Sequence, residues 1–336
     1  MRRNLRFQRL SGQRDLQRLL RLLGGLPACD SVRGQRSLSR DVRWQLRSER
    51  QLWQLPLARD LESTTITARD GRSLGATIFR AEDAKATVII APASATPQSF
   101  YRHFAAGLAS AGFDTLTFDY RGIGRSRPPS LRGFEATMRQ WGSEDLSGAI
   151  TWARAQGCAK VFLVGHSAGG QLVGVAEGVE QLDGVYLAAS SSGYYGHWQG
   201  LPRLAIKSTF YLIPALARIF GYLPYGMLGG EDLPRGVAIE WSTWGRHPKY
   251  IESAGATFSR VRAPLRALSF ADDQFACRRA VEALVQSYGG AEREHVHLRP
   301  REVGMKAIGH FGFYRKEAQT KLWPDAVDWL TALASR

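Results

Sequence analysis

One serine of this chain lies in a setting that makes its hydroxyl a candidate nucleophile. Ser167 is the middle residue of the pentapeptide GHSAG at positions 165–169, which matches the pattern Gly-x-Ser-x-Gly. Apolar residues at 161–164 precede it, and residues compatible with a helix follow it. A serine at such a strand-to-helix turn holds its Oγ clear of the sheet, and the glycines let the backbone pass closely. The pattern therefore predicts covalent catalysis in which Ser167 attacks a carbonyl group.

A base must take the proton from that serine, and the chain has seven histidines. With this turn the chain order is serine, acid, histidine, which excludes the four histidines at 103, 166, 197 and 247. His295 and His297 alternate along an expected strand, so both point to one face and serve packing or face solvent. His310 lies in the loop sequence IGHFGF at 308–313, where glycines free the backbone and aromatic side chains can screen the imidazole from water. We therefore predict that His310 is the base.

The acid that orients this histidine is expected at the end of a strand between the serine and the histidine. Asp272 and Asp273 follow an expected strand at 265–270. Neighbouring residues at a strand end point to opposite sides, so only one of the two carboxylates can reach the histidine. The spacing to the next helix favours Asp273 and leaves Asp272 as a turn or helix-cap residue, with the reverse assignment as the alternative.

Developing negative charge on the attacked carbonyl oxygen needs backbone amides that already point at it, each contributing about 3 kcal/mol to the barrier. One donor is expected to be the amide of Ala168, the residue after the nucleophile. The second is expected in the loop after the strand at 86–91. Pro92 has no amide hydrogen, which leaves the amides of residues 93, 94 and 95. Among these we favour Ser94.

The elements that must position these residues follow from the apolar pattern. Continuous apolar runs typical of buried parallel strands alternate with helical segments, so a doubly wound, mostly parallel α/β sheet is expected. A hairpin with its turn at Asp70-Gly71 comes first. The strands are expected at 64–68, 74–79, 86–91, 115–118, 161–164, 184–188, 265–270 and near 296, and the helices at 99–111, 144–155, 278–288 and 323–333.

The same pattern divides the chain into three parts. Residues 61–190 and 261–336 form the expected core, and residues 1–60 form a basic N-terminal extension that we expect to be poorly ordered. Residues 191–260 break the strand–helix repeat and are rich in aromatic side chains, which suits a helical cap inserted after the sixth strand. Such aromatics can roof an apolar pocket above Ser167 or pack the cap onto the sheet. Contact of this segment with a lipid surface is a further alternative.

The charge, the cysteine content and the apolar runs of the sequence limit which partners and which compartment are expected. The net charge is +15, but residues 1–60 hold fourteen arginines and five acids, or 14 − 5 = +9 of it. These arginines are scattered and no nucleic-acid fold signature accompanies them, so no nucleic-acid partner is expected. The three cysteines form no C-x-x-C pair, which favours a reduced compartment, the cytoplasm, and argues against structural zinc. No apolar run reaches the roughly 18 residues of a membrane span, and neither a cofactor nor a metal is expected.

A second glycine-containing loop, FDYRGIGRS at 118–126, does not match a dinucleotide-binding loop. Arg127 stands where the third glycine belongs, and these glycines do not open a helix. We expect instead that Asp119 and Arg121 hold this loop beside the site by a charge-assisted hydrogen bond.

Together these motifs resemble the α/β-hydrolase superfamily over roughly residues 62–336. The segments at 119–126, 165–169, 272–273 and 309–313 are similar to those of bacterial serine aminopeptidase-like and monoglyceride-lipase-like hydrolases. The segment GEDLPRG at 230–236, followed by Trp241 and Trp244, is similar to the cap insertion of that group. The resemblance implies the α/β-hydrolase fold.

The residues predict a serine hydrolase that cleaves a carboxylic ester with an apolar or moderately sized acyl group. In this hypothesis Ser167, Asp273 and His310 form the triad, and the amides of Ala168 and Ser94 form the oxyanion hole. A thioesterase, an amidase or an acyltransferase would use the same triad. A catalytically inactive binding protein with this fold is the alternative from another functional class.

Overall fold

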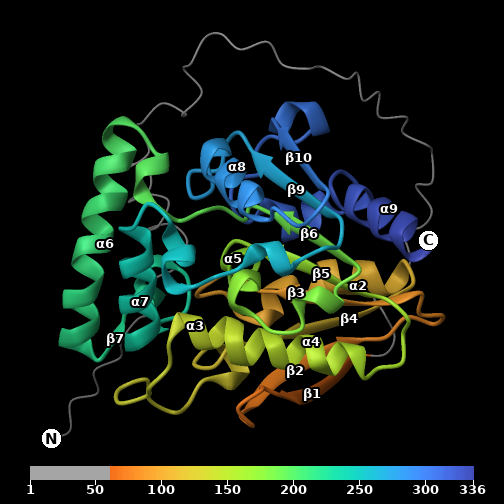
Figure 1. Cartoon of the computed structure of the whole chain (residues 1–336), viewed down its shortest axis with the longest axis horizontal. Helices are drawn as coiled ribbons and strands as arrows, with labels where there is room; N and C mark the ends of the chain where they lie inside the picture. The colour runs from red at the N-terminus through yellow and green to blue at the C-terminus, as the bar shows by residue number, and fades with distance from the viewer. Residues whose placement is uncertain (1–60) are drawn as a thin grey trace, which may run out of the picture.

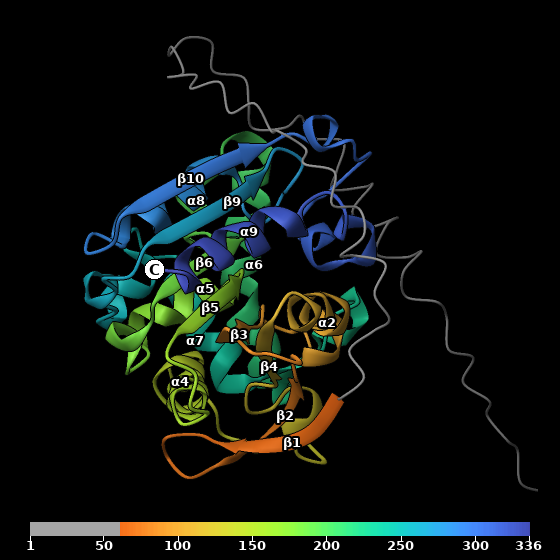
Figure 2. The same cartoon turned by 90° about the vertical axis from the view of Figure 1, so that its right-hand side faces the viewer.

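A mixed sheet of eight strands runs through residues 61–336, the part of the chain that the computed structural model describes (Figure 1). The strand order is β1-β2-β4-β3-β5-β6-β9-β10, as seen along the sheet in Figure 2. The β1–β2 and β2–β4 pairs are antiparallel and the other pairs are parallel. The strands are β1 Leu61–Thr67, β2 Ser73–Phe79, β3 Ala86–Ala91, β4 Phe113–Phe118, β5 Val161–His166, β6 Gly184–Ala188, β9 Leu265–Phe270 and β10 Arg293–Leu298.

Helices cover both faces of this sheet. The helices α2 (Arg102–Ser110) and α9 (Trp323–Ala334) lie on one face, and α4 (Ser147–Arg154) and α8 (Arg278–Ser287) lie on the other (Figure 2). Every residue of β3, β4, β5 and β6 is buried as a result. This is the physical reason why β3, β5 and β6 are almost continuous apolar runs, whereas β4 has polar residues, Asp114, Thr115 and Thr117, that are also buried. The expected doubly wound α/β class is confirmed.

Two helices start differently from the expectation. The predicted helix at 144–155 begins earlier, as α3 (Met138–Gln140), runs through a π-helical segment over Trp141–Leu146, and continues as α4. The first turn of the helix expected at 99–111 is a 3₁₀ turn over Gln98–Tyr101, after which α2 begins. Both irregular turns adjoin the loops that hold the candidate site, where such departures from regular helix are common.

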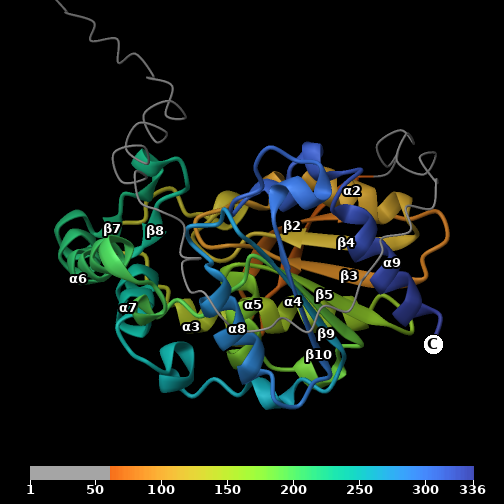
Figure 3. The ribbon, with the colours of Figure 1, turned by 90° about the horizontal axis from the view of Figure 1, so that it is seen from above.

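The insertion between β6 and β9 forms a separate layer beside the sheet. It contains α6 (Gly200–Phe220), the short antiparallel pair β7 (Tyr222–Leu223) and β8 (Leu233–Pro234), and α7 (Arg235–Gly245). Figure 3 shows these elements to one side of the sheet, with α6 outermost. We refer to residues 191–260 as the cap. The predicted extension at 1–60 lies outside the described residues.

No helix within residues 61–336 has both the length and the apolar character needed to cross a membrane.

Candidate active site

The turn after β5 holds Ser167 in a strained conformation. Its φ is +50° and its ψ is −113°, a region that a residue with a Cβ adopts only when the surroundings impose it. The short helix α5 (Ala168–Leu172) starts immediately afterwards. A Cβ at Gly169 would lie 2.1 Å from the carbonyl oxygen of Ala91, so only glycine fits there. The turn therefore fixes the backbone of a serine whose side chain is only partly buried.

The loops after β9 and β10 bring an acid and a histidine together. Asp273 Oδ2 lies 2.9 Å from Nδ1 of His310. The other oxygen of that carboxylate accepts hydrogen bonds from the amides of Phe275 and Ala276, at 2.8 and 2.9 Å. The Asp273 side chain is 0% exposed and the His310 side chain 8%. With Nδ1–H donated to a fixed carboxylate, Nε2 of His310 has a free lone pair, which is the arrangement of a general base.

The neighbouring acid, Asp272, makes a different contact. Its Oδ2 accepts a hydrogen bond of 2.8 Å from the amide of Ile308, two residues before His310. Asp272 therefore connects the end of β9 to the loop that holds the histidine. The expectation of a turn or helix-cap role for Asp272 was incomplete, because the partner is 36 residues away in the chain.

His166, which chain order excludes as the base, connects Ser167 to the His310 loop. It is fully buried, and its Nε2 lies 2.9 Å from the carbonyl oxygen of His310. A carbonyl can only accept, so Nε2 carries the proton and Nδ1 accepts from the hydroxyl of Tyr101 at 2.8 Å. Burial lowers the pKa of His166 well below its usual range, so the ring stays neutral.

This chain of hydrogen bonds continues to the loop after β3. The hydroxyl of Tyr101 accepts the amide hydrogen of Ala93 at 2.8 Å, and burial raises the pKa of that hydroxyl, which keeps it protonated. Three segments are thus connected through one neutral imidazole: the candidate oxyanion loop, the serine turn and the histidine loop. Tyr101 and His166 were not predicted as site residues, and the one signal for them in the sequence is the position of His166 beside Ser167.

The Ser167 hydroxyl makes no hydrogen bond to the His310 ring within residues 61–336. Such bonds are often long before substrate binds and shorten in the enzyme–substrate complex. The contact between His166 and the His310 carbonyl nevertheless holds the histidine loop against the residue that precedes Ser167.

The loop after β3 leaves two candidate donors, the amides of Ser94 and Ala95, and Ser94 remains the favoured one. The amide of Ala93 already donates to Tyr101, which removes Ala93 from the three alternatives. The carbonyl oxygen of Ala95 accepts the amide of Glu231 from the cap at 2.8 Å. Across the described residues, the amides of Ser94 and Ala168 have no hydrogen-bond partner. Both are therefore available to a ligand oxygen.

The cap contacts the loop at 118–126, the loop after β9 and the helix α5 that follows Ser167. The Glu231 carboxylate accepts the amide of Gly124, the Trp198 indole donates to the carbonyl of Gln274, and the Tyr250 hydroxyl donates to the side chain of Gln171 on α5. Several of the cap aromatics therefore serve packing: Trp198, Phe210, Trp244 and Tyr250 are buried.

Aromatic side chains surround the imidazole of His310. The rings of Phe311 and Phe275 lie 5.1 and 5.4 Å from it, and Phe275 is 48% exposed. Phe311 is one of the aromatic residues expected from the loop sequence, and Phe275, from the loop after β9, adds a second ring that was not predicted.

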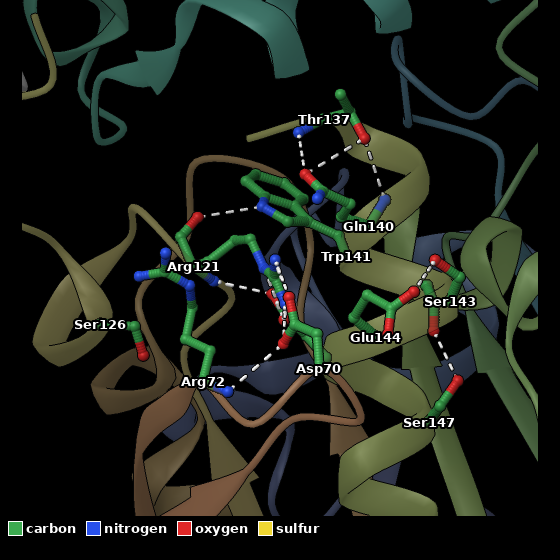
Figure 4. A network of polar contacts seen from close by, with 12 residues as sticks. Asp70, Arg72, Arg121, Ser126, Thr137, Gln140, Trp141, Ser143, Glu144 and Ser147 are labelled. Atoms are coloured by element: carbon green, nitrogen blue, oxygen red, sulfur yellow. Dashed lines mark hydrogen bonds and ion pairs between the residues drawn. The ribbon is translucent and has the colours of Figure 1, made fainter. Parts of the chain in front are cut away.

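The loop at 118–126 is held differently from the expectation. Asp119 and Arg121 do not pair with each other. The buried guanidinium of Arg121 forms ion pairs with Asp70 at 2.7 Å and with Asp145 at 2.6 Å. The backbone carbonyl of Arg121 accepts a hydrogen bond from the Trp141 indole (Figure 4). The Asp119 carboxylate instead accepts from residues 98 and 125. The two side chains diverge because the chain leaves the sheet at Phe118, and their partners come from other segments.

The two histidines of β10 share one hydroxyl. His295 Nε2 and His297 Nδ1 each lie 2.7 Å from Oγ of Ser269 on β9, which places both rings on one face of the sheet, as expected. Burial lowers the pKa of His295 to about 4. These rings are structural groups of the sheet and are separate from the candidate triad.

This depressed pKa predicts a pH-dependent stability. The unfolded chain protonates His295 near pH 6.5 and the folded chain only near pH 4, so stability falls as pH decreases through this range. For His295→Gln, we expect the loss of unfolding free energy between pH 7 and pH 5 to be smaller than in the wild type by about 2 kcal/mol. Urea unfolding at both pH values measures this difference, and the exposed-site variant His247→Gln is the control. An identical loss in His295→Gln and wild type would contradict the prediction.

The family model described as serine aminopeptidase, S33, matches residues 82–219, which include Ser94 and Ser167 and end before Asp273 and His310. A search of curated proteins finds no match.

Solved structures of hydrolases are similar in fold. A soluble variant of monoglyceride lipase from Saccharomyces cerevisiae superposes on this chain with a TM-score of 0.58 at 15% sequence identity, covering 84% of this chain and 98% of the lipase chain. The Pyrococcus furiosus esterase has a TM-score of 0.54 at 13% identity, covering 82% and 91%. A thermophilic esterase from Thermogutta terrifontis has a TM-score of 0.54 at 14% sequence identity, covering 81% of this chain and 99% of the esterase chain.

Proposed function

We propose that the chain is a serine esterase of the α/β-hydrolase superfamily, acting on apolar or moderately sized acyl groups; the match to the serine aminopeptidase family model and the fold shared with solved hydrolases support this. The observation that supports this most strongly is the hydrogen bond between His310 and Asp273. The carboxylate is buried and fixed by two backbone amides, and the carbonyl of His310 accepts a hydrogen bond from His166, the residue before Ser167. This arrangement is suited to activating a hydroxyl nucleophile.

The proposed acylation step uses each of these groups once. Nε2 of His310 takes the proton from Ser167 as Oγ bonds to the ester carbonyl carbon, and the carbonyl π electrons move to the oxygen. The amides of Ala168 and Ser94 hold the resulting oxyanion. When the tetrahedral intermediate collapses, the C–O bond to the alcohol breaks and the alcohol leaves with the proton from His310. Asp273 stays ionised throughout and stabilises the imidazolium.

Deacylation repeats these steps with water. His310 removes a proton from a water molecule as its oxygen bonds to the acyl carbon. Collapse of the second tetrahedral intermediate breaks the bond to Ser167 Oγ, which regains its proton from His310 and releases the acid. The neutral, buried His166 holds the His310 carbonyl in place and takes no proton in either step.

The preference for an apolar acyl group rests on the surroundings of His310. Phe275 and Phe311 present apolar rings beside the imidazole, and Phe275 is accessible to a ligand. The similar solved structures include enzymes named as esterases and as a monoglyceride lipase. We propose that the cap covers this site as a lid, because its residues Glu231 and Trp198 contact the loops next to Ser94 and Asp273.

Labelling with a fluorophosphonate probe tests the proposal. The probe forms a covalent bond only with an activated serine, so the wild type should be labelled at Ser167 and Ser167→Ala should not be labelled. Ser110→Ala, which removes a helix-surface hydroxyl, should be labelled like the wild type. A folded wild-type protein that does not react, or equal labelling of Ser167→Ala, would show that Ser167 is not an activated nucleophile.

A further inference from the structure

The outer helix of the cap exposes an unusual amount of apolar surface. Nine large hydrophobic side chains are exposed in the described part of the chain, and seven of them belong to α6. They are Leu201, Leu204, Tyr211, Leu212, Leu216, Ile219 and Phe220, with exposed fractions from 38% to 72%. Single exposed apolar residues need no explanation, but a contiguous set of this size marks an interaction surface.

The spacing of these residues places most of them on one face of α6. Leu201, Leu204, Leu212 and Ile219 follow one another at helical intervals, and the positions between them on that face are Ser208 and Ala215. The opposite face, with Phe210 and its neighbours, is buried, and the Phe210 ring packs on Trp241 of α7 at 5.4 Å. Figures 1 and 3 both show α6 at the outer edge of the molecule, with α7 between it and the sheet.

Charge identifies the kind of partner that fits this face. The 21 residues of α6 include no acid, and its cations Arg203, Lys207 and Arg218 are all exposed. The Arg203 and Lys207 head groups both lie 5.7 Å from the ring of Tyr195, so they extend along the same side of the helix. An apolar face bordered by cations is typical of helices that lie in the plane of an anionic lipid interface.

The positive charge of α6 argues against two other partners, a second copy of the chain and the chain's own residues 1–60. A second copy would bring the same three cations of α6 close to its own, and like charges at an interface are unfavourable. Residues 1–60 have a net charge of +9, from fourteen arginines and five acids, so they too would repel this helix. An anionic surface is the complementary partner.

We propose that α6 docks the protein on the surface of an anionic phospholipid membrane. The helix lies flat on the membrane, with Leu201, Leu212 and Ile219 at the boundary of the acyl chains. The flanking cations contact lipid phosphates. This binding function is separate from the proposed esterase activity and does not depend on it.

Vesicle flotation with the full-length protein tests this surface. We expect the wild type to float with vesicles of 70% phosphatidylcholine and 30% phosphatidylglycerol, and much less with phosphatidylcholine alone. The double variant Leu212→Asp/Ile219→Asp should show a vesicle affinity lower by at least about tenfold, because two exposed apolar groups become anionic. The matched control is Leu61→Asp, which changes a leucine of similar exposure on β1 and should bind like the wild type.

Three further measurements separate this proposal from its alternatives. The melting temperature of the double variant and its hydrolysis of a water-soluble short-chain ester should equal those of the wild type. If the protein hydrolyses no ester, the flotation result still decides the docking proposal. A wild type that does not float, or a double variant that floats equally well, would overturn the proposal. So would light scattering that shows a wild-type dimer and a monomeric double variant, because a second copy would then cover α6.

Discussion

Alanine at Ser167, at His310 or at both positions is expected to lower kcat for ester hydrolysis by nearly the same factor, about 10⁶-fold. The nucleophile and the base act as one unit in the proposed mechanism. Once His310 is absent, the Ser167 hydroxyl keeps its proton and is too weak a nucleophile to attack. Once Ser167 is absent, His310 has no proton to accept.

Steady-state kinetics of the two single variants and the double variant measure this non-additivity. Activity above the uncatalysed rate, roughly 10³–10⁴-fold, should persist in all three, because the amides of Ala168 and Ser94 still hold an oxyanion. Losses that multiply in the double variant would mean that the two residues act independently, and the triad hypothesis would then be wrong. Far-ultraviolet circular dichroism of each variant provides the control for folding.

The core of the fold was accessible from the sequence because its strands are buried on both faces. The predicted bounds of β3, β6 and β9 coincide with those in the structure, since β3 and β6 are almost continuous apolar runs and β9 ends where the turn with Asp272 and Asp273 begins. The serine turn was equally accessible, because glycine is required at 169 for backbone contact with Ala91. These features depend on residues that are close together in the chain.

The features that escaped prediction depend on contacts between distant segments. Tyr101 and His166 are 65 residues apart and meet only when β5 lies beside the loop after β3. Arg121 finds Asp70 across 51 residues, so its pairing with Asp119 seemed the nearer choice. Nothing in the local pattern shows that the apolar residues of α6 lie on two opposite faces, one of them exposed.

Asp273→Asn is the second substitution with a large expected effect, a fall in kcat of about 10⁴-fold. The two amides of Phe275 and Ala276 hold Oδ1 as the acceptor, so the new amide nitrogen takes the place of Oδ2 and faces His310. That nitrogen donates to Nδ1, so the proton of the neutral ring moves to Nε2. His310 then has no lone pair directed at Ser167, and the stabilising charge is also lost.

The neighbouring variant Asp272→Asn is the matched control, because it makes the same chemical change one residue away. Its Oδ1 can still accept the amide of Ile308, so the histidine loop stays in place and kcat should fall by less than about tenfold. Comparing kcat and KM of the two variants decides which carboxylate orients the base. If Asp272→Asn causes the larger loss of kcat, Asp272 is the acid of the triad, and the contact between Asp273 and His310 is structural.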